Sequence, residues 1–340
     1  MNPKRDSSID LLRVFAAIAV IGLHVLRANG GVVAIHIYHI CGFAVPLFFV
    51  ISGYLLLDRE ISFCYLLTKI IGIVKLVTIW NIIVTIPLTV ANIIRGNSII
   101  SFFPLFLRQC INSVTQGESV LFQFWYFLAL LIVYIIAFVI SKLAEESKTL
   151  KYRLISILWV SSLVLSVTIQ IISYINKYPV QSAIIQPMRI WTWIQYFLLG
   201  SLLKITESLW NNYKCRKIYF GTFIAFTVLS ICVEYLGGGI LNELHSEFFY
   251  DDFAIICWVI SIFVFVKSMN IGFIKWVNQI ALITLGTFIL HTIVRKVVIH
   301  FWEPTNTFGL LLIWGIVSCI TVVTCLVINK MPGLKKLINM

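Results

Sequence analysis

Three polar residues near the start of the chain are of types that could do chemistry: Asp10, Arg13 and His24. They interrupt an apolar segment of membrane-spanning length. At about 100° per residue, Arg13 and His24 are separated by about three helical turns, so these two residues and Asp10 lie in one stripe on one face of a helix. Arg13 and His24 are then roughly 16 Å apart along the helix axis. Charged groups inside a membrane are costly unless they face a partner or a water-filled cavity, so an aligned set predicts a functional site. The structural alternative is an Asp10–Arg13 pair near the interface and a His24 that only hydrogen-bonds a neighbouring helix.

The composition determines the kind of element that carries this stripe. Of the 340 residues, 60% are hydrophobic and only 12% are charged, which excludes a soluble domain because such a surface would aggregate. The apolar runs are too long and uniform for strands of a membrane barrel. The sequence therefore predicts an all-α, polytopic membrane helix bundle that forms a single domain over residues 1–340.

We expect about ten transmembrane helices. Their limits are Ser8 to Leu26, His36 to Leu57, Leu66 to Val90, Leu121 to Ser141, Leu154 to Tyr174, Met188 to Leu203, Ile218 to Tyr235, Asp252 to Val266, Val277 to Ile299, and Gly309 to Ile328.

The distribution of Lys and Arg predicts that both termini are cytoplasmic. With that orientation most basic residues fall in cytoplasmic segments: Lys4, Arg5, Arg59, Lys69, Lys142, Lys148, Lys151, Arg153, Lys204, Lys214, Arg216, Lys217, Lys267, Lys275, Lys330, Lys335 and Lys336. Fewer fall in outer loops or near outer helix ends: Arg27, Arg95, Arg108, Lys177, Arg189, Arg295 and Lys296. The net charge of +12 is thus a signal of topology, and we expect membrane lipid but no nucleic acid as a partner.

Other polar and aromatic residues within the spans are further candidates. Lys69 and Lys75, near the cytoplasmic end of the third span, either extend to the interface or contact the phosphates of an anionic cofactor. Trp125 and Tyr126 form either an aromatic belt or a platform for a sugar ring. In the ninth span, His291 is expected at a depth comparable to that of His24, in the outer half of the membrane, where the two could face a shared cavity.

Two further patterns concern metals and close helix packing. The eight cysteines include no C-x-x-C pair, which argues against a zinc site or a disulfide framework, and we expect no metal. The acidic outer loop with Glu243, His245 and Glu247 is expected to be solvated; binding of sugar hydroxyls or of a metal are the alternatives. In the second span Pro46 predicts a kink, and Gly53 would let another backbone approach closely.

Several segments together resemble the acyltransferase 3 family of integral membrane O-acyltransferases, and within it the shorter form similar to the bacterial enzyme that O-acetylates enterobacterial common antigen. The resemblance covers nearly the whole chain, and the family's ten-helix plan matches the expected spans. Its carriers are Ile9-Asp10-Leu-Leu-Arg13 followed by His24, Val45-Pro46 through Ser52-Gly53-Tyr54, Phe124-Trp125-Tyr126-Phe127-Leu128, Tyr196 through Gly200, and Leu285-Gly286 through His291.

This resemblance implies a cytoplasmic acyl-CoA donor, usually acetyl-CoA, a glycan acceptor across the membrane, and a multi-pass protein of the bacterial cytoplasmic membrane. It gives Arg13 and His24 the essential roles. Two positions depart from the family pattern: Lys69-Ile-Ile-Gly72 stands where many members have Arg-x-x-Arg, and Gln123 stands where many have His.

The resulting hypothesis is a membrane O-acetyltransferase. The nucleotide of acetyl-CoA docks at Lys69 and Lys75, its arm passes Arg13, and His24 acts as a general base or as a nucleophile. Asp10 orients Arg13, His291 is a second base or supports the acceptor, and Trp125, Tyr126 and Gln123 are the expected substrate-binding residues. The alternative is an exporter of a polysaccharide or lipid-linked sugar. The sequence leaves open whether the chain forms a homo-oligomer.

Overall fold

Helix α1 (Ser7–Val25) lies at the centre of the structure. The computed structural model describes residues 6–26, 31–57, 59–96 and 98–338. Three of the basic residues expected at the membrane surfaces, Lys4, Arg5 and Arg27, lie outside these ranges. In α1, 67% of the most apolar window is buried inside the protein, against 22% in α7 (Lys148–Asn176). The stripe of polar residues on α1 therefore faces other helices. We call the face of the bundle at which α1 begins the N face and the opposite one the far face.

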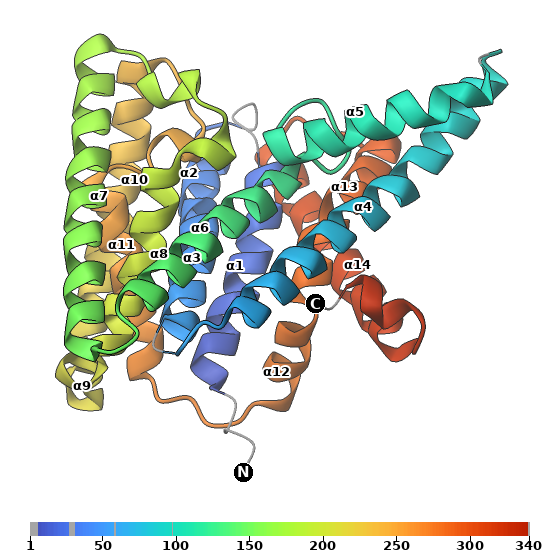
Figure 1. Cartoon of the computed structure of the whole chain (residues 1–340). Helices are drawn as coiled ribbons and strands as arrows, with labels where there is room; N and C mark the ends of the chain where they lie inside the picture. Colours follow the sequence, from blue (N-terminus) through green and yellow to red (C-terminus); the bar gives the residue numbers. More distant parts are fainter. Residues whose placement is uncertain (1–5, 27–30, 58, 97, 339–340) are drawn as a thin grey trace.

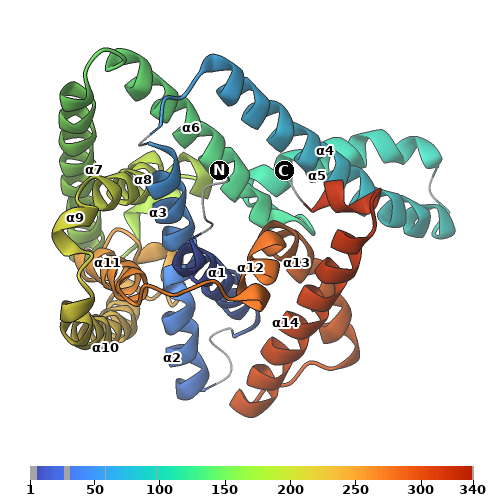
Figure 2. The ribbon, with the colours of Figure 1, turned by 90° about the horizontal axis from the view of Figure 1, so that it is seen from below.

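The remaining helices surround α1 in two groups. In Figures 1 and 2, α7, α8, α10 and α11 lie on one side of α1, and α4, α5, α13 and α14 lie on the other. The bounds of these helices, and of α6, α9 and α12, are α4 Phe63–Ile94, α5 Phe102–Thr115, α6 Trp125–Leu143, α8 Ile190–Ile205, α9 Glu207–Trp210, α10 Arg216–Leu241, α11 Phe253–Ser268, α12 Lys275–Leu282, α13 Thr284–Phe301 and α14 Thr307–Lys330.

Eight of the elements of the described residues are long and apolar enough to cross a membrane. They correspond to eight of the ten expected spans, and the all-α membrane bundle is confirmed. The sixth and eighth spans correspond to α8 and α11, which have only 16 residues each and are mostly buried. The ninth, expected to be one helix from Val277 to Ile299, is two: α12 ends at Leu282 and α13 begins at Thr284. Helix α5 was not expected; it folds back along the upper part of α4 (Figure 1).

The second span is interrupted as Pro46 predicts. It consists of α2 (Val32–Ile40), a 3₁₀ turn at Cys41–Phe43, and α3 (Ala44–Leu56). Because Pro46 has no N–H, it cannot donate to the carbonyl of Gly42 one turn earlier, and the break falls at that turn.

Helices α3 and α8 pack backbone against backbone. A Cβ atom on Gly53 would lie 1.7 Å from the carbonyl oxygen of Phe197, and one on Gly200 would lie 1.9 Å from that of Val50. Glycine is therefore required on both sides of this contact, which confirms the close approach expected at Gly53.

Charged residues from several elements meet at the N face. The Lys267 ammonium lies 2.6 Å from the Asp6 carboxylate and 3.2 Å from that of Glu207, which also pairs with Lys204 at 2.8 Å. Both lysines lie over the ring of Tyr54, at 5.0 and 5.4 Å from its centre. Burial alone would raise the pKa of Glu207, but hydrogen bonds from Lys204 and Tyr54 and the charge of Lys267 lower it to about 2. This cluster ties the N-face ends of α1, α3, α8 and α11 together.

Candidate active site

The polar residues of α1 are supported by a helix that sequence analysis did not separate. The Asp10 carboxylate, 1% exposed, lies 3.5 Å from the Arg13 guanidinium and accepts a hydrogen bond of 2.5 Å from the side-chain amide of Asn278. Asn278 is on α12, which packs along α1. Asp10 is thus fixed between two donors, as an orienting role toward Arg13 requires.

Toward the far face, the two histidines meet. The rings of His24 and His291 are stacked with their centres 5.1 Å apart, and the ring of Phe122 stands edge-on to His24 at 5.0 Å. The Nδ1 atom of His291 lies 3.2 Å from the carbonyl oxygen of Thr287, which can only accept, so Nδ1 carries the proton of this bond. The Nε2 atom of His291 has no hydrogen-bond partner in the described part of the chain.

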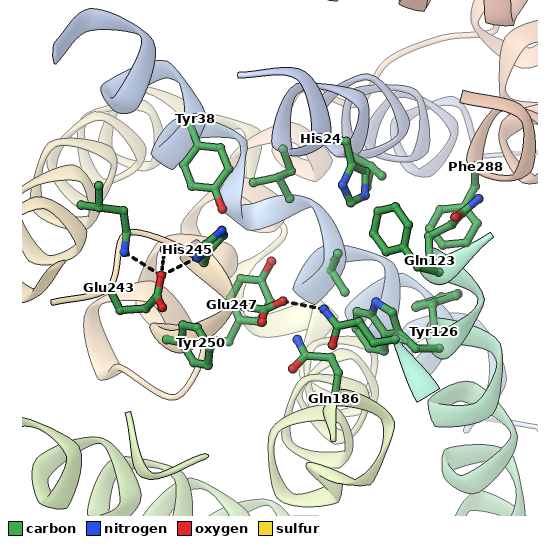
Figure 3. A pocket seen from close by; sticks show the side chains of 18 residues that line it. His24, Tyr38, Gln123, Tyr126, Gln186, Glu243, His245, Glu247, Tyr250 and Phe288 are labelled. Atoms are coloured by element: carbon green, nitrogen blue, oxygen red, sulfur yellow. Dashed lines mark hydrogen bonds and ion pairs between the residues drawn. The ribbon is translucent and has the colours of Figure 1, made fainter. Parts of the chain in front are cut away.

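His24 lines a cavity of about 390 Å³ near the far face (Figure 3). Gln123, Trp125 and Tyr126, the expected substrate-binding residues, also line it, while His291 lies behind His24 and does not. Four of the candidates named from sequence are therefore brought to one cavity.

Gln123 holds the wall of the cavity against α13. Its side-chain amide donates to the carbonyl oxygen of Ile289 at 3.1 Å and to the Thr292 hydroxyl at 3.0 Å. These bonds fix the turn of α13 that carries His291. The Oε1 atom of Gln123 has no partner among the described residues, although the side chain is 1% exposed.

Aromatic rings form one side of the cavity. Trp125 lies against Trp193 with ring centres 5.0 Å apart, and Trp193 stacks on Phe49 at the same distance. Tyr126 packs on Phe49 at 5.0 Å and on Phe288 at 5.3 Å. Trp125 is buried and Tyr126 is partly buried between other rings of the bundle, so an aromatic belt at the membrane surface does not describe them.

The acidic segment between α10 and α11 covers the opposite side of the cavity. Its expected solvation holds in part: the side chains of His245 and Glu243 are 64% and 29% exposed, whereas the aromatic run that follows is buried. Phe248, Phe249 and Tyr250 are buried at 9% exposure or less, and Glu243, His245 and Glu247 line the cavity. Figure 3 shows these side chains facing His24 and Gln123 across the space. The segment folds inward because its aromatic run supplies apolar surface that the bundle buries.

A buried hydrogen-bonded group fixes this segment from behind. Glu234 on α10 is 2.6 Å from the Nδ1 atom of His39 on α2 and accepts a 2.6 Å hydrogen bond from the Ser246 hydroxyl. The hydroxyl of Tyr38, which lines the cavity, accepts from the Ser246 amide at 3.2 Å. These four side chains connect α2, α10 and the acidic segment.

The two lysines expected to bind the donor lie elsewhere. Lys69 stands over the ring of Tyr65, 5.6 Å from its centre, and neither it nor Lys75 lines the cavity of His24. Lys75 lines a second cavity of about 280 Å³, between α4 and the C-terminal segment, together with Lys336. The structure thus separates Lys69 and Lys75 from the far-face cavity.

No metal centre is visible in the described residues. They contain no group of three His, Cys, Asp or Glu side chains that would hold an ion, and all eight cysteines are free. The pair Glu243 and His245 forms a hydrogen bond within the segment.

Sequence reasoning missed several residues of the cavity. Gln116, Gln186 and Tyr250 come from the end of α5 and from two connections between helices. No spacing pattern in the sequence predicts a role for these three residues. The one feature that could have indicated it is that each is a polar residue in a short connection between spans.

Comparison with known protein families identifies the family of this chain. A family model described as an acyltransferase domain, acyltransferase 3, matches residues 6–330. The chain belongs to the acyltransferase 3 family. Its Arg13, His24 and His291 lie within the matched range, and so do all the residues of the far-face cavity. No curated protein and no solved structure matches the chain. The acyltransferase 3 chain is therefore a membrane protein that transfers acyl groups; the closer similarity to the enzyme for enterobacterial common antigen stays a prediction.

Proposed function

We propose that the protein moves an acetyl group from cytoplasmic acetyl-CoA to a hydroxyl of a cell-surface or lipid-linked glycan. The observation that carries this proposal is that one helix presents Arg13 within the bundle and His24 in the far-face cavity, roughly 16 Å further along. In this proposal the N face is cytoplasmic, and the membrane is the bacterial cytoplasmic membrane.

The chemistry requires a base next to the acceptor and a support for the donor. His24 accepts the proton of the acceptor hydroxyl while the hydroxyl oxygen attacks the carbonyl carbon of the thioester. The carbon–sulfur bond then breaks, and the CoA sulfur leaves and takes up a proton. An acyl-imidazole formed first on His24 is the second route. Arg13, oriented by Asp10, holds the arm of the donor or stabilises negative charge on the reacting oxygen.

The partners of His24 support its role. A ring that stacks on His291 and meets the edge of Phe122 is restricted in orientation, as a base must be in order to act on one hydroxyl. The aromatic side of the cavity, with Trp125 and Tyr126, is suited to the apolar face of a sugar ring. Lys75, with Lys69 in the same helix, is the proposed contact for the phosphates of the donor.

The test compares surface glycan from cells with the intact gene, a deletion, His24→Ala, and His300→Ala. The last is a matched control, because His300 is an exposed histidine on the helix of His291 and lies outside the cavity. We expect NMR before and after mild alkali to show an unchanged amount of glycan and loss of the alkali-labile acetyl signal in the deletion and His24→Ala only. Loss of the glycan itself would instead support an exporter, and a normal acetyl signal in His24→Ala at normal protein abundance would contradict the role of His24.

A further inference from the structure

Two glutamates line the far-face cavity, whereas no lysine or arginine of the described chain does. Of the 18 residues that line it within the described chain, Glu243 and Glu247 are acidic and none is Lys or Arg. Arg189, whose charge acts on Glu247, stacks on the ring of Phe248 at 5.1 Å, is 4% exposed, and is not part of the lining. His24 and His245 also line the cavity, and His245 is paired with Glu243. A ligand in this cavity therefore meets two carboxylates and no Lys or Arg side chain of the lining.

The carboxylates are held in place. The backbone carbonyl of Phe248 accepts a hydrogen bond of 2.7 Å from Gln181, and that of Tyr250 accepts one of 2.6 Å from the Tyr196 hydroxyl. The Glu247 carboxylate itself accepts a 3.1 Å hydrogen bond from Gln116 at the end of α5. The backbone bonds hold the path of the segment, and the bond from Gln116 holds the Glu247 carboxylate, so this charge cannot easily swing away from a ligand.

Buried amide groups facing the cavity have no partner in the described structure. Both the oxygen and the nitrogen of the Gln186 side chain lack a hydrogen bond, although Gln186 is 1% exposed and lines the cavity, and Oε1 of Gln123 lacks one as well. In Figure 3 the Gln186 amide points toward Glu247 and the space above it. A buried amide without a partner is costly, and an oxygen beside an N–H matches neighbouring hydroxyls, which both donate and accept.

We propose that this cavity binds a sugar unit that carries no negative charge and rejects units with a carboxylate, phosphate or sulfate. The inference rests on the proposed function and names the class of its acceptor. Gln186 and Gln123 pair with hydroxyls, Trp125 and Tyr126 cover the ring, and Glu243 and Glu247 exclude anions. Exclusion by like charge is an established source of specificity, and a carboxylate in a partly buried site is screened less than one in water.

The test uses the purified full chain in detergent, acetyl-CoA with a labelled acetyl group, and two oligosaccharides. They differ only at one C6, which is a hydroxymethyl group in one and a carboxylate in the other. We expect kcat/KM to be at least about tenfold higher for the neutral oligosaccharide at low ionic strength, and the ratio to fall as salt is added. We also expect Glu243→Gln combined with Glu247→Gln to reduce the ratio severalfold.

The matched control is Glu118→Gln, an exposed carboxylate outside the cavity that pairs with Arg108; it should leave the ratio unchanged. Equal rates with both oligosaccharides, or a preference for the acidic one, would overturn the inference while leaving acetyl transfer intact. If neither oligosaccharide is acetylated, the proposed function fails and the inference fails with it. The salt dependence of the wild type tests the inference even if the glutamate variants do not fold.

Discussion

The imidazole rings of His24 and His291 are stacked, with their planes inclined by only 21°, although they come from the first helix and from one of the last. Only His24 reaches the cavity, and His291 is tied to its own helix through Nδ1. The pair therefore divides into a group that can touch substrate and a group that can position it.

This division predicts unequal effects of the two histidines. We expect His24→Ala to lower kcat/KM for acetyl transfer about 10²–10⁴-fold, the usual contribution of a general base. His291→Ala should cost less, and the double variant should be close to His24→Ala alone, because residues in contact do not contribute additively. Kinetics of the three purified variants check this, with His300→Ala as the control. Additive losses would show that the rings act independently.

The contact between α3 and α8 predicts that adding one methyl group at Gly200 strongly lowers the stability of the protein. Gly200→Ala places a Cβ atom against the carbonyl oxygen of Val50, so the helices have to separate; we expect a loss of at least about 2 kcal/mol and a fall in Tm of several degrees. Thermal unfolding in detergent measures it. Gly221→Ala is the matched control, because a Cβ atom there meets nothing within 4 Å. A Tm of Gly200→Ala equal to that of the control would refute the close contact.

The N-face cluster predicts a dependence of stability on pH. The folded protein lowers the pKa of Glu207 to about 2 from its ordinary value of 4.5. The contribution of its charge to stability is therefore fully present above about pH 4.5 and is lost as pH falls toward 2. We expect Glu207→Gln to lower Tm at pH 6 and to lose much of its effect at pH 3. Glu145→Gln serves as the control, since Glu145 pairs with Lys142 at the same spacing as Glu207 with Lys204 but is exposed. A constant effect of Glu207→Gln across this range would contradict the ionic origin of the contribution.

The buried carboxylate of Glu234 predicts that Glu234→Ala lowers stability more than Ser246→Ala does. Glu234→Ala leaves both His39 and Ser246 without this partner, at about 1–3 kcal/mol for each buried group. Ser246→Ala keeps the bond between Glu234 and His39 and should cost less. Thermal unfolding and limited proteolysis between α10 and α11 measure both. Equal stability of the two variants would show that Glu234 does not hold the acidic segment.

Much of the site was predictable because hydropathy and helical spacing determine it. One helix carries Asp10, Arg13 and His24, and the predicted level of His291 places it near His24 once the spans are counted. Local chemistry at Pro46 and Gly53 likewise predicted the break in the second span and the close contact of α3. These features depend on residues within one element or on the depth of a span.

The remaining features depend on contacts between distant segments. Ile283, where α12 gives way to α13, is neither Gly nor Pro, so no local signal marked that break or the placing of Asn278 against Asp10. The inward fold of the acidic segment follows from bonds such as those of Gln181 and Tyr196 to its backbone. Charge alone indicated a solvated loop, which describes the exposed His245 but not the aromatic run that the bundle buries.

The way this segment is fastened has an evolutionary consequence. Gln181 and Tyr196 bind backbone carbonyls, and Ser246 supplies the contact with Glu234, so the path of the segment does not require the side chains of His245 or Glu247. In the proposed function, substitutions at these two positions alter which acceptor the cavity binds and leave α1, the helix of Arg13 and His24, as it is. Descendants of one ancestral chain can thus diverge toward different acceptors through a few exchanges on one segment, while α1 stays under separate selection.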